Sequence, residues 1–208
     1  TVALIPPLAP VFSGFALASI VITLLLTNAF AYAFATISRN QRDQLMKLAT
    51  KDALTGAGNR WALQQKLKDI ISSRARSNQP SSLLLIDLDH FKQVNDAFGH
   101  AVGDQILVNL TEVVNLRIRV TDSLYRIGGE EFVVVVEGQD LEKAQHLAEQ
   151  LRTLVEANEL GPQHSVTISL GVAELGKDES ADDWLRRADD ALYCAKRAGR
   201  NTTSVAHV

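Results

Sequence analysis

The sequence predicts an α+β fold, an antiparallel-centred sheet with helices packed on it, preceded by one transmembrane helix. Three observations support this fold class. Helical periodicity alternates with short apolar runs from residue 52 onward. Two of those runs, residues 123–127 and 132–136, are separated by only four residues, which makes them neighbouring strands of a hairpin. The first 38 residues contain no charged side chain.

The apolar N-terminal segment predicts a membrane span over residues 11–37, which are dominated by Ala, Leu, Ile, Val and Phe. An uncharged apolar stretch of more than about 18 residues is long enough to cross the bilayer, and this one is long enough to cross with tilt. Thr23, Thr27 and Asn28 would then face other helices. A cleavable signal peptide is the competing interpretation, but it would carry its basic residues before the apolar core. A buried helix of a soluble protein is a further alternative.

The charges around this segment predict its orientation. Basic residues follow the span, and positive charge collects on the cytoplasmic side of a membrane, so the remainder of the chain is expected to be cytoplasmic. Residues 1–10, which contain three prolines, are expected to form an extracytoplasmic loop, and the span is interpreted as the last helix of a longer membrane protein. The basic residues are Arg39, Arg42, Lys47 and Lys51.

The segment between the span and the globular region, residues 38–51, favours a helix that continues out of the membrane. Ile37, Leu45 and Leu48 fit one apolar seam, although the segment is too short to establish a heptad repeat. A signalling linker helix and an ordinary solvated helix both remain open.

Composition excludes some functions. The net charge of −3 argues against a nucleic-acid-binding surface, which is normally basic. The single cysteine, Cys194, excludes an intrachain disulfide and fits a reducing compartment. Because Cys194 lies in the helical run 184–197 beside Leu192 and Ala195, we expect it to be a buried packing residue rather than a nucleophile.

Residues 52–208 form one domain of ordinary size, in which each element follows from local pattern. Gly199 is placed to end the last helix. The expected helices are 61–75, 104–118, 141–157 and 182–197, and the expected strands outside the hairpin are 83–86 and 166–173, with a loop over 77–82.

Gly128, Gly129, Glu130 and Glu131 occupy the hairpin connection. Glycine accepts the positive φ that such tight turns need, and without a side chain it lets a polyanionic ligand approach the backbone. Two adjacent glutamates at a rigid tip suit a divalent cation. The alternative is that they simply keep the tip solvated.

Asp87 and Asp89 directly follow the apolar run 83–86. An acid at the end of a buried strand is expected to lie in a cleft and to meet carboxylates of a neighbouring strand. Asp87 with Glu130 would form an oxygen site suited to Mg²⁺, which binds one or two carboxylates plus substrate phosphates. The alternative, stronger for Asp89 than for Asp87, is capping of the helix that begins near His90.

These motifs resemble the GGDEF-domain family, the bacterial diguanylate cyclases. Gly-Gly-Glu-Glu-Phe at 128–132 is similar to the Glu variant of the family's eponymous motif, and residues 87–104 are similar to its Asp-x-Asp-x-Phe-Lys signature segment. Residues 52–60 resemble the first motif of that domain, and 166–173 and 195–201 resemble its closing segments. The resemblance runs in register from residue 52 to about residue 205.

The resemblance implies a palm-like fold, as in polymerases and nucleotidyl cyclases. It also implies an enzyme that condenses two GTP into cyclic di-GMP with release of pyrophosphate, acting as a homodimer at the bacterial inner membrane. Asp87, Glu130 and the Leu88 carbonyl would hold Mg²⁺, with Mn²⁺ as a substitute. Glu130 would be the general base, Glu131 its neighbour in the metal shell, and Lys92 would neutralise developing phosphate charge.

The resemblance also assigns the substrate contacts. Asn95 and Asp104 match guanine-recognising positions, which fits because a carboxylate accepts the N–H pair that guanine presents and an amide both donates and accepts. The alternatives are a local turn role for Asn95 and a solvated helix face for the basic residues. The other expected contacts with GTP are His100, the backbone at Gly128 and Gly129, and Lys196 and Arg200 on the triphosphate.

A second site is implied by Arg119 and Asp122, since five residues separate Asp122 from Gly128, the spacing of the family's inhibitory product site. Arginine stacks on and hydrogen-bonds guanine, and a carboxylate pairs with its edge. Gln150 stands where a supporting arginine is common, so weaker product inhibition is expected. Arg152, two positions on, is expected to point elsewhere on its helix.

The leading hypothesis is a membrane-tethered diguanylate cyclase with no nucleic-acid partner. One rival is a catalytically idle GGDEF domain that binds cyclic di-GMP or GTP, and another is a membrane-anchored scaffold whose GTP site serves dimerisation. The intact residues 128–132 favour the enzyme. The sequence does not identify the input signal.

Overall fold

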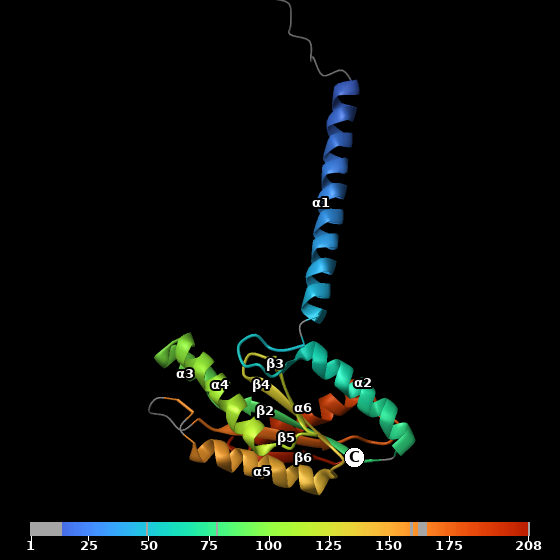
Figure 1. Cartoon of the computed structure of the whole chain (residues 1–208). Coiled ribbons are helices and arrows are strands. Elements are labelled where there is room, and N and C mark those ends of the chain that lie inside the picture. The colour runs from blue at the N-terminus through green and yellow to red at the C-terminus, as the bar shows by residue number, and fades with distance from the viewer. Residues whose placement is uncertain (1–13, 49, 78, 159, 162–165, 208) are drawn as a thin grey trace, which may run out of the picture. The chain divides into compact units, whose positions relative to one another are not determined.

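The computed structural model describes residues 14–48, 50–77, 79–158, 160–161 and 166–207, and its central feature is a six-stranded mixed sheet (Figure 1). The helices are α1 Gly14–Leu48, α2 Arg60–Ser77, α3 Phe91–Phe98, α4 His100–Arg117, α5 Leu141–Ala157 and α6 Ala181–Arg197. The strands are β1 Gly58–Asn59, β2 Ser81–Leu88, β3 Ser123–Gly128, β4 Glu131–Glu137, β5 Ile168–Glu174 and β6 Thr203–Ala206.

The chain divides into two compact units, residues 1–48 and 49–208. Within the first, Phe15–Arg39 of α1 is long and apolar enough to cross a membrane, and none of its most apolar window is buried in the protein. Helix α1 continues through most of the expected linker but ends at Leu48; Lys51, expected to be helical, forms an isolated bridge with Gly58 instead. The expected loop over residues 1–10 lies outside the described residues.

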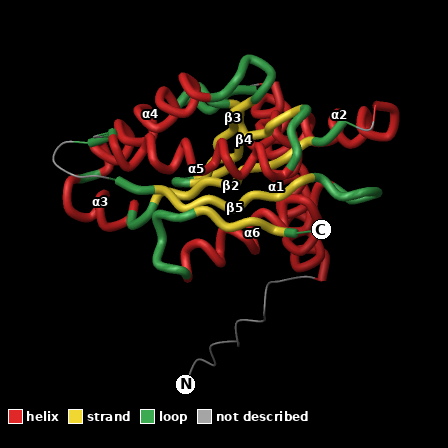
Figure 2. The backbone as a smooth tube through the Cα atoms, turned by 90° about the horizontal axis from the view of Figure 1, so that it is seen from below, coloured by secondary structure: helices red, strands yellow, loops and turns green. Residues whose placement is uncertain are grey.

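The sheet has the strand order β1-β3-β4-β2-β5-β6. Its four central strands are antiparallel, and the edge strands β1 and β6 pair in parallel with β3 and β5. The predicted antiparallel-centred sheet is therefore confirmed. Strand β2 lies between β4 and β5, so the residues of β2 have neighbours on both sides, and Figure 2 shows these strands side by side among the helices.

Helices cover both faces of the sheet because the apolar strands carry large side chains on alternate faces. Leu84, Ile86 and Leu88 of β2 join one core with apolar residues of α4 and α5. Leu83 and Leu85 join the second core, which contains residues of α2 and α6. Alternation along β2 then places Asp87 on the same face as Leu83 and Leu85, toward α6.

Helix α6 is held on β5 by a close backbone approach. A Cβ atom at Gly171 would collide with the backbone at Ala188 and Leu192 of α6, so the two elements meet where only glycine fits. Trp184, fully buried, donates from its ring N–H to the Ala173 carbonyl at 2.9 Å. These contacts fix the path of α6, and hence where its last turn carries Lys196.

Cys194 corrects one expectation, because it lies on the exposed side of α6 rather than in the core. The buried residues of this helix include Trp184, Ala188, Ala191 and Ala195, which repeat every three to four positions. Position 194 falls beside that stripe rather than within it. The prediction that Cys194 is a buried packing residue is therefore wrong.

Gly171→Ala is expected to destabilise the domain by about 1–3 kcal/mol, because its methyl group must displace the α6 backbone in a close-packed interior. Urea unfolding of the full chain in detergent micelles measures this. Gly128→Ala is the matched control, since its Cβ would meet nothing nearer than a carboxylate oxygen at 3.9 Å. Equal stability of the two variants would contradict the close approach.

Candidate active site

Asp87 lies within the last part of β2, one residue before the strand ends. Its cross-strand partner in β4 is Glu131, and its partner in β5 is Ser169. Opposite residues of antiparallel strands share a face, so the carboxylates of Asp87 and Glu131 are brought to the same side of the sheet. The side chain of Asp87 is buried, with a residue exposure of 6%.

Lys196 is the cation that meets this buried carboxylate. Its Nζ lies 2.7 Å from Oδ2 of Asp87. Burial raises the pKa of Asp87, and the nearby carboxylates Glu130 and Glu131 raise it further, while the ion pair with Lys196 opposes both effects. The site is therefore a cluster of negative charge partly neutralised by one amino group.

The hairpin turn consists of Gly129 and Glu130, because Gly128 ends β3 and pairs with Glu131 at the start of β4. Gly129 has φ of +41°, which glycine adopts at little cost. Arg126 fixes this turn: its Nε and one terminal nitrogen donate to the Gly129 carbonyl at 3.0 and 2.8 Å. The expected role of glycine in the turn is thus seen at Gly129.

Arg126 also reaches the segment that precedes α2. Its other terminal nitrogen lies 3.0 Å from Oδ1 of Asp52, and the same oxygen accepts from the backbone N–H and hydroxyl of Thr55 at 2.9 and 2.7 Å. Burial alone would raise the pKa of Asp52, but the hydrogen bonds from Thr55 and Arg126 outweigh it and hold that pKa below its usual value. Sequence reasoning did not assign Arg126 a role, although its place before the Gly-Gly pair was a usable signal.

Asp89 is a buried carboxylate that hydrogen-bonds to two distant segments of the chain rather than capping a helix. The residue at the start of α3, His90, has no side-chain capping bond, whereas Asp89 accepts from the hydroxyls of Thr167 and Ser169, each at 2.7 Å. It also accepts from the backbone N–H of Asn201 at 2.9 Å. The capping interpretation of Asp89 is therefore wrong: a carboxylate with 4% exposure needs several donors, and they come from Thr167 just before β5, from Ser169 within β5 and from the segment after α6.

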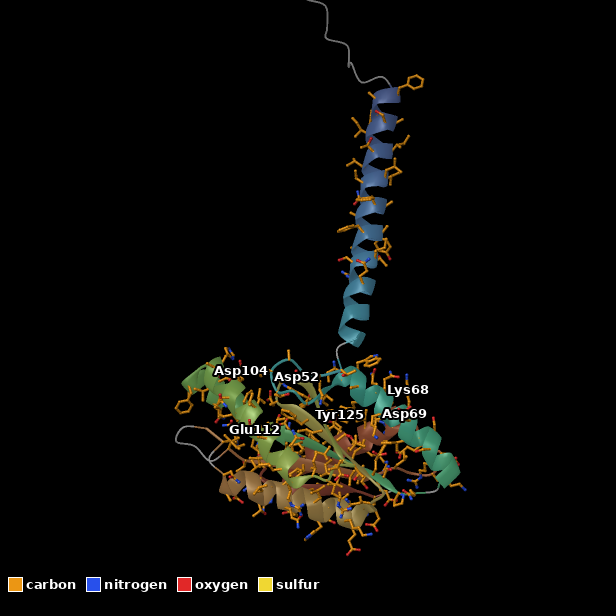
Figure 3. The ribbon with its side chains drawn as sticks, in the orientation of Figure 1. Asp52, Lys68, Asp69, Asp104, Glu112 and Tyr125 are labelled. Atoms are coloured by element: carbon orange, nitrogen blue, oxygen red, sulfur yellow. The ribbon has the colours of Figure 1, made fainter. Side chains whose placement is uncertain are left out.

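Helices α3 and α4 bring together the residues expected to recognise guanine. Only Gly99, with φ of +83°, separates the two helices, which forces them to fold back on each other. The Asn95 carboxamide packs against Gly103 so closely that a Cβ there would collide with its oxygen. Asp104 is the next residue and is exposed on α4 (Figure 3).

The other expected substrate contacts lie at the surface. Lys92 in the first turn of α3 and His100 at the start of α4 are both exposed. Arg200 is also exposed and has φ of +66° in the segment between α6 and β6.

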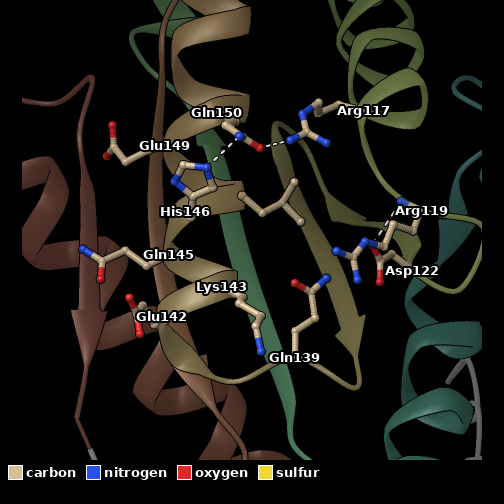
Figure 4. A pocket seen from close by; sticks show the side chains of 11 residues that line it. Arg117, Arg119, Asp122, Gln139, Glu142, Lys143, Gln145, His146, Glu149 and Gln150 are labelled. Atoms are coloured by element: carbon tan, nitrogen blue, oxygen red, sulfur yellow. Dashed lines mark hydrogen bonds between the residues drawn. The ribbon is translucent and has the colours of Figure 1, made fainter.

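Arg119 and Asp122 line a groove of about 600 Å³ between the end of α4 and helix α5 (Figure 4). One carboxylate oxygen of Asp122 accepts from the Arg119 backbone N–H at 3.0 Å, and the other, buried, has no hydrogen-bond partner among the described residues. Gln150 faces the groove and is hydrogen-bonded to Arg117 and to His146.

A cation would need ligands beyond the protein carboxylates. Within the described parts of the chain, no group of three or more His, Cys, Asp or Glu side chains is arranged to hold a metal ion. The donor set near Asp87 consists of carboxylates and backbone oxygens, which suits a hard cation such as Mg²⁺ completed by phosphate oxygens and water.

Comparison with known proteins identifies the family. The sequence model described as diguanylate cyclase, GGDEF domain, matches residues 49–202. The probable diguanylate cyclase DgcC of Escherichia coli strain K12 is 39% identical over 203 residues, which cover 95% of this chain and 54% of DgcC. The response regulator PleD of Caulobacter vibrioides is 38% identical over 169 residues, 78% of this chain and 37% of PleD. The chain thus spans about half, or less, of these relatives.

Solved structures agree with this identification. The coiled coil and GGDEF domain of DgcB from Caulobacter crescentus, in complex with c-di-GMP, superposes with a TM-score of 0.74 at 29% identity, covering 88% of this chain and 100% of that one. The active GGEEF domain of a diguanylate cyclase from Vibrio cholerae has a TM-score of 0.65 at 37% identity, covering 69% and 96%.

Gly103→Ala is expected to lower the affinity for a non-reacting GTP analogue about tenfold, although alanine normally favours a helix by about 1 kcal/mol. The added methyl group displaces the Asn95 side chain, so the variant should behave like Asn95→Ala in calorimetric titration. Wild-type affinity in Gly103→Ala, with a loss in Asn95→Ala, would contradict this packing.

Asp52→Asn is expected to destabilise the domain at pH 7 by about 1.5–3 kcal/mol, the range for hydrogen bonds to a charged group. Because the folded pKa of Asp52 is depressed, its contribution is complete above the unfolded pKa of about 3.9 and is lost as pH falls through the folded pKa. Urea unfolding at pH 7 and pH 3.5 should show the difference from wild type shrinking. Asp69→Asn, on the exposed face of α2, is the control; a pH-independent deficit in Asp52→Asn would refute the ionic origin.

Proposed function

This chain belongs to the GGDEF family of diguanylate cyclase domains, and from that premise we propose that it joins two GTP molecules into cyclic di-GMP. In each of two steps the 3′-oxygen of one guanosine forms a bond to the α-phosphorus of the other. The bond from that phosphorus to the α,β-bridging oxygen breaks, and pyrophosphate leaves. Two such steps close the ring and release two pyrophosphates.

The observation that carries this proposal is the charge cluster at the hairpin. Glu130 lies in the turn, Glu131 lies opposite Asp87, and Lys196 pairs with Asp87. A structural hairpin has no need for Glu130 and Glu131 near the buried carboxylate of Asp87, because the repulsion among these charges is unfavourable. A site for a cation and a polyphosphate does need them.

The carboxylates fit Mg²⁺, with Mn²⁺ as a substitute, through Asp87, Glu130 and the Leu88 carbonyl. A divalent ion held by these residues would supply positive charge that neutralises the phosphates and favours the ionised form of the attacking hydroxyl. Lys196 is the cation that pairs with Asp87, and its side chain would swing from Asp87 to the phosphate oxygens when the nucleotide binds.

The remaining residues bind and orient GTP. Asn95 and Asp104 hold the guanine edge, with His100 beside them at the α3–α4 junction. The Gly128 and Gly129 backbone leaves room for the phosphates. Lys92, Lys196 and Arg200 neutralise the phosphate oxygens. Glu130 accepts the proton of the 3′-hydroxyl, and Glu131 supports the charge of the metal shell.

One domain supplies half of the reaction site. Each domain holds one GTP, so the 3′-hydroxyl of one substrate meets the α-phosphate of the other only when two copies face each other. Helix α1 would anchor both copies in the bacterial inner membrane, with the domain in the cytoplasm, and the helical continuation toward Leu48 would transmit the membrane input to their encounter.

The groove at Arg119 and Asp122 would bind the product as a feedback inhibitor. The unpaired Asp122 oxygen is available to the N–H groups of a guanine edge, and Arg119 offers a guanidinium for stacking. The DgcB structure contains c-di-GMP. Because Gln150 stands on the helix across the groove, inhibition is expected to be weak in this chain.

Glu130→Gln is expected to reduce cyclic di-GMP formation at least about 100-fold, the usual minimum for loss of a positioned base, while the fold is retained. Incubation of the full chain in detergent micelles with GTP and Mg²⁺, with products separated by chromatography, measures this. Glu112→Gln, exposed on α4, is the control of equal charge.

The same assay distinguishes the enzyme from the two rival functions, a binding module and a membrane-anchored scaffold. A wild-type chain that binds GTP or cyclic di-GMP without forming product would be a binding module or scaffold, and the enzyme proposal would then be wrong. A fully active Glu130→Gln would refute the role of Glu130.

A further inference from the structure

The segment between α6 and β6, residues 198–202, has an unusual backbone. Three successive residues, Gly199, Arg200 and Asn201, have φ of +117°, +66° and +44°. For the two residues that are not glycine this conformation is unfavourable, more so for Arg200 than for Asn201, and it persists where the surroundings impose it. Arg200, the proposed triphosphate ligand, lies in the middle of this 198–202 loop.

Asn201 forms the hydrogen bonds that hold the 198–202 loop against neighbouring elements. Its backbone N–H donates to Asp89 at 2.9 Å, which ties the loop to the end of β2. Its side-chain oxygen accepts from Arg152 at 2.9 Å, and its side-chain nitrogen donates to Glu156 at 2.7 Å, which ties the loop to α5. Both ends of the Asn201 amide are therefore satisfied.

Arg152 organises the α5 side of this contact. Its guanidinium bonds to Glu149 at 2.9 Å and to Glu156 at 2.8 Å, and its side chain is only 19% exposed. The two carboxylates, which lie on the same helix, thus orient the guanidinium group of Arg152 toward Asn201. As expected from its position on the helix, Arg152 does not line the groove at Arg119.

We propose that Arg152 is a positioning residue for nucleotide binding, acting through Asn201 to hold the 198–202 loop so that Arg200 meets the β- and γ-phosphates. This inference rests on the proposed function, because it takes GTP as the ligand of Arg200. Arg152 itself touches no substrate. Its contribution lies in keeping the strained loop in one conformation before the nucleotide arrives.

The inference makes a selective prediction. Loss of the Arg152–Asn201 contact frees the loop and weakens the contact with the terminal phosphates, but leaves guanine recognition at Asn95 and Asp104 intact. A merely structural role of Arg152 would affect all guanine nucleotides alike. Affinity for a triphosphate relative to a monophosphate therefore separates the two possibilities.

The experiment measures binding of the α,β-methylene analogue of GTP and of GMP, each with Mg²⁺, to the full chain in detergent micelles. Arg152→Gln and Asn201→Gly are expected to lose about tenfold in affinity for the triphosphate and less than about twofold for GMP. Glycine at 201 accepts the positive φ, so this variant removes the side-chain tether without adding backbone strain. Arg186→Gln is the control, since it removes an exposed α6 ion pair with Asp183 and should change neither affinity.

The double variant Arg152→Gln/Asn201→Gly tests whether the two residues act through one contact. Its loss should equal that of Asn201→Gly alone, because removal of the Asn201 side chain already breaks the contact with Arg152. Independent losses that multiply, equal losses for triphosphate and GMP, or wild-type affinity in either single variant would overturn the inference. Should Arg152→Gln not fold, Asn201→Gly alone decides the question.

The outcome is distinguishable from failure of the proposed function, because the analogue cannot turn over. A wild-type chain that binds the analogue but makes no cyclic di-GMP contradicts the proposed function. The affinity for the analogue relative to that for GMP, compared between wild type and variants, still tests the role of Arg152.

Discussion

The buried carboxylate of Asp87 is the constraint on which the rest of the site depends. A charge in the interior must be compensated, and here the compensation comes from Lys196, whose position follows from the close packing of α6 on β5 at Gly171. The antiparallel ladder adds Glu131 directly across from Asp87. The sheet register, the packing of α6 on β5 and the charge balance of the site therefore depend on one another. A change in the register or in the packing would leave the buried carboxylate of Asp87 uncompensated.

Around this centre, three connections hold irregular segments in place. Arg126 ties the hairpin turn to Asp52, Asn95 packs on Gly103, and Asn201 joins the 198–202 loop to Asp89 and α5. In each connection a polar side chain fixes a loop or helix end that local sequence preference alone would leave free. The proposed catalytic and substrate residues lie next to these connections, which explains how a site built largely on turns is held in a defined geometry.

The sequence predicted the parts of this arrangement that depend on local pattern. Helix 141–157, the strands around residues 123–136 and the apolar N-terminal helix follow from periodicity, and the pairing of the hairpin follows from its short connection. The two short edge strands and the role of Asp89 depend on which distant segments meet, and no local pattern contains that information. The exposure of Cys194, by contrast, follows from the helical spacing of the buried residues of α6. Asp89 and Arg152 illustrate this, because both bond to Asn201, which lies 112 and 49 residues away in sequence. The roles proposed for the site residues come from the family resemblance, and the structure adds how Asp87, Lys196 and Asn95 are packed and paired.

The most direct test is a crystal structure of the chain with the α,β-methylene analogue of GTP and Mg²⁺. We expect the metal between the carboxylates of Asp87 and Glu130, the guanine edge at Asn95 and Asp104, and the Lys196 amino group moved from its 2.7 Å contact with Asp87 onto the triphosphate. A nucleotide bound elsewhere, or Lys196 still paired with Asp87 beside an occupied nucleotide site, would contradict the account.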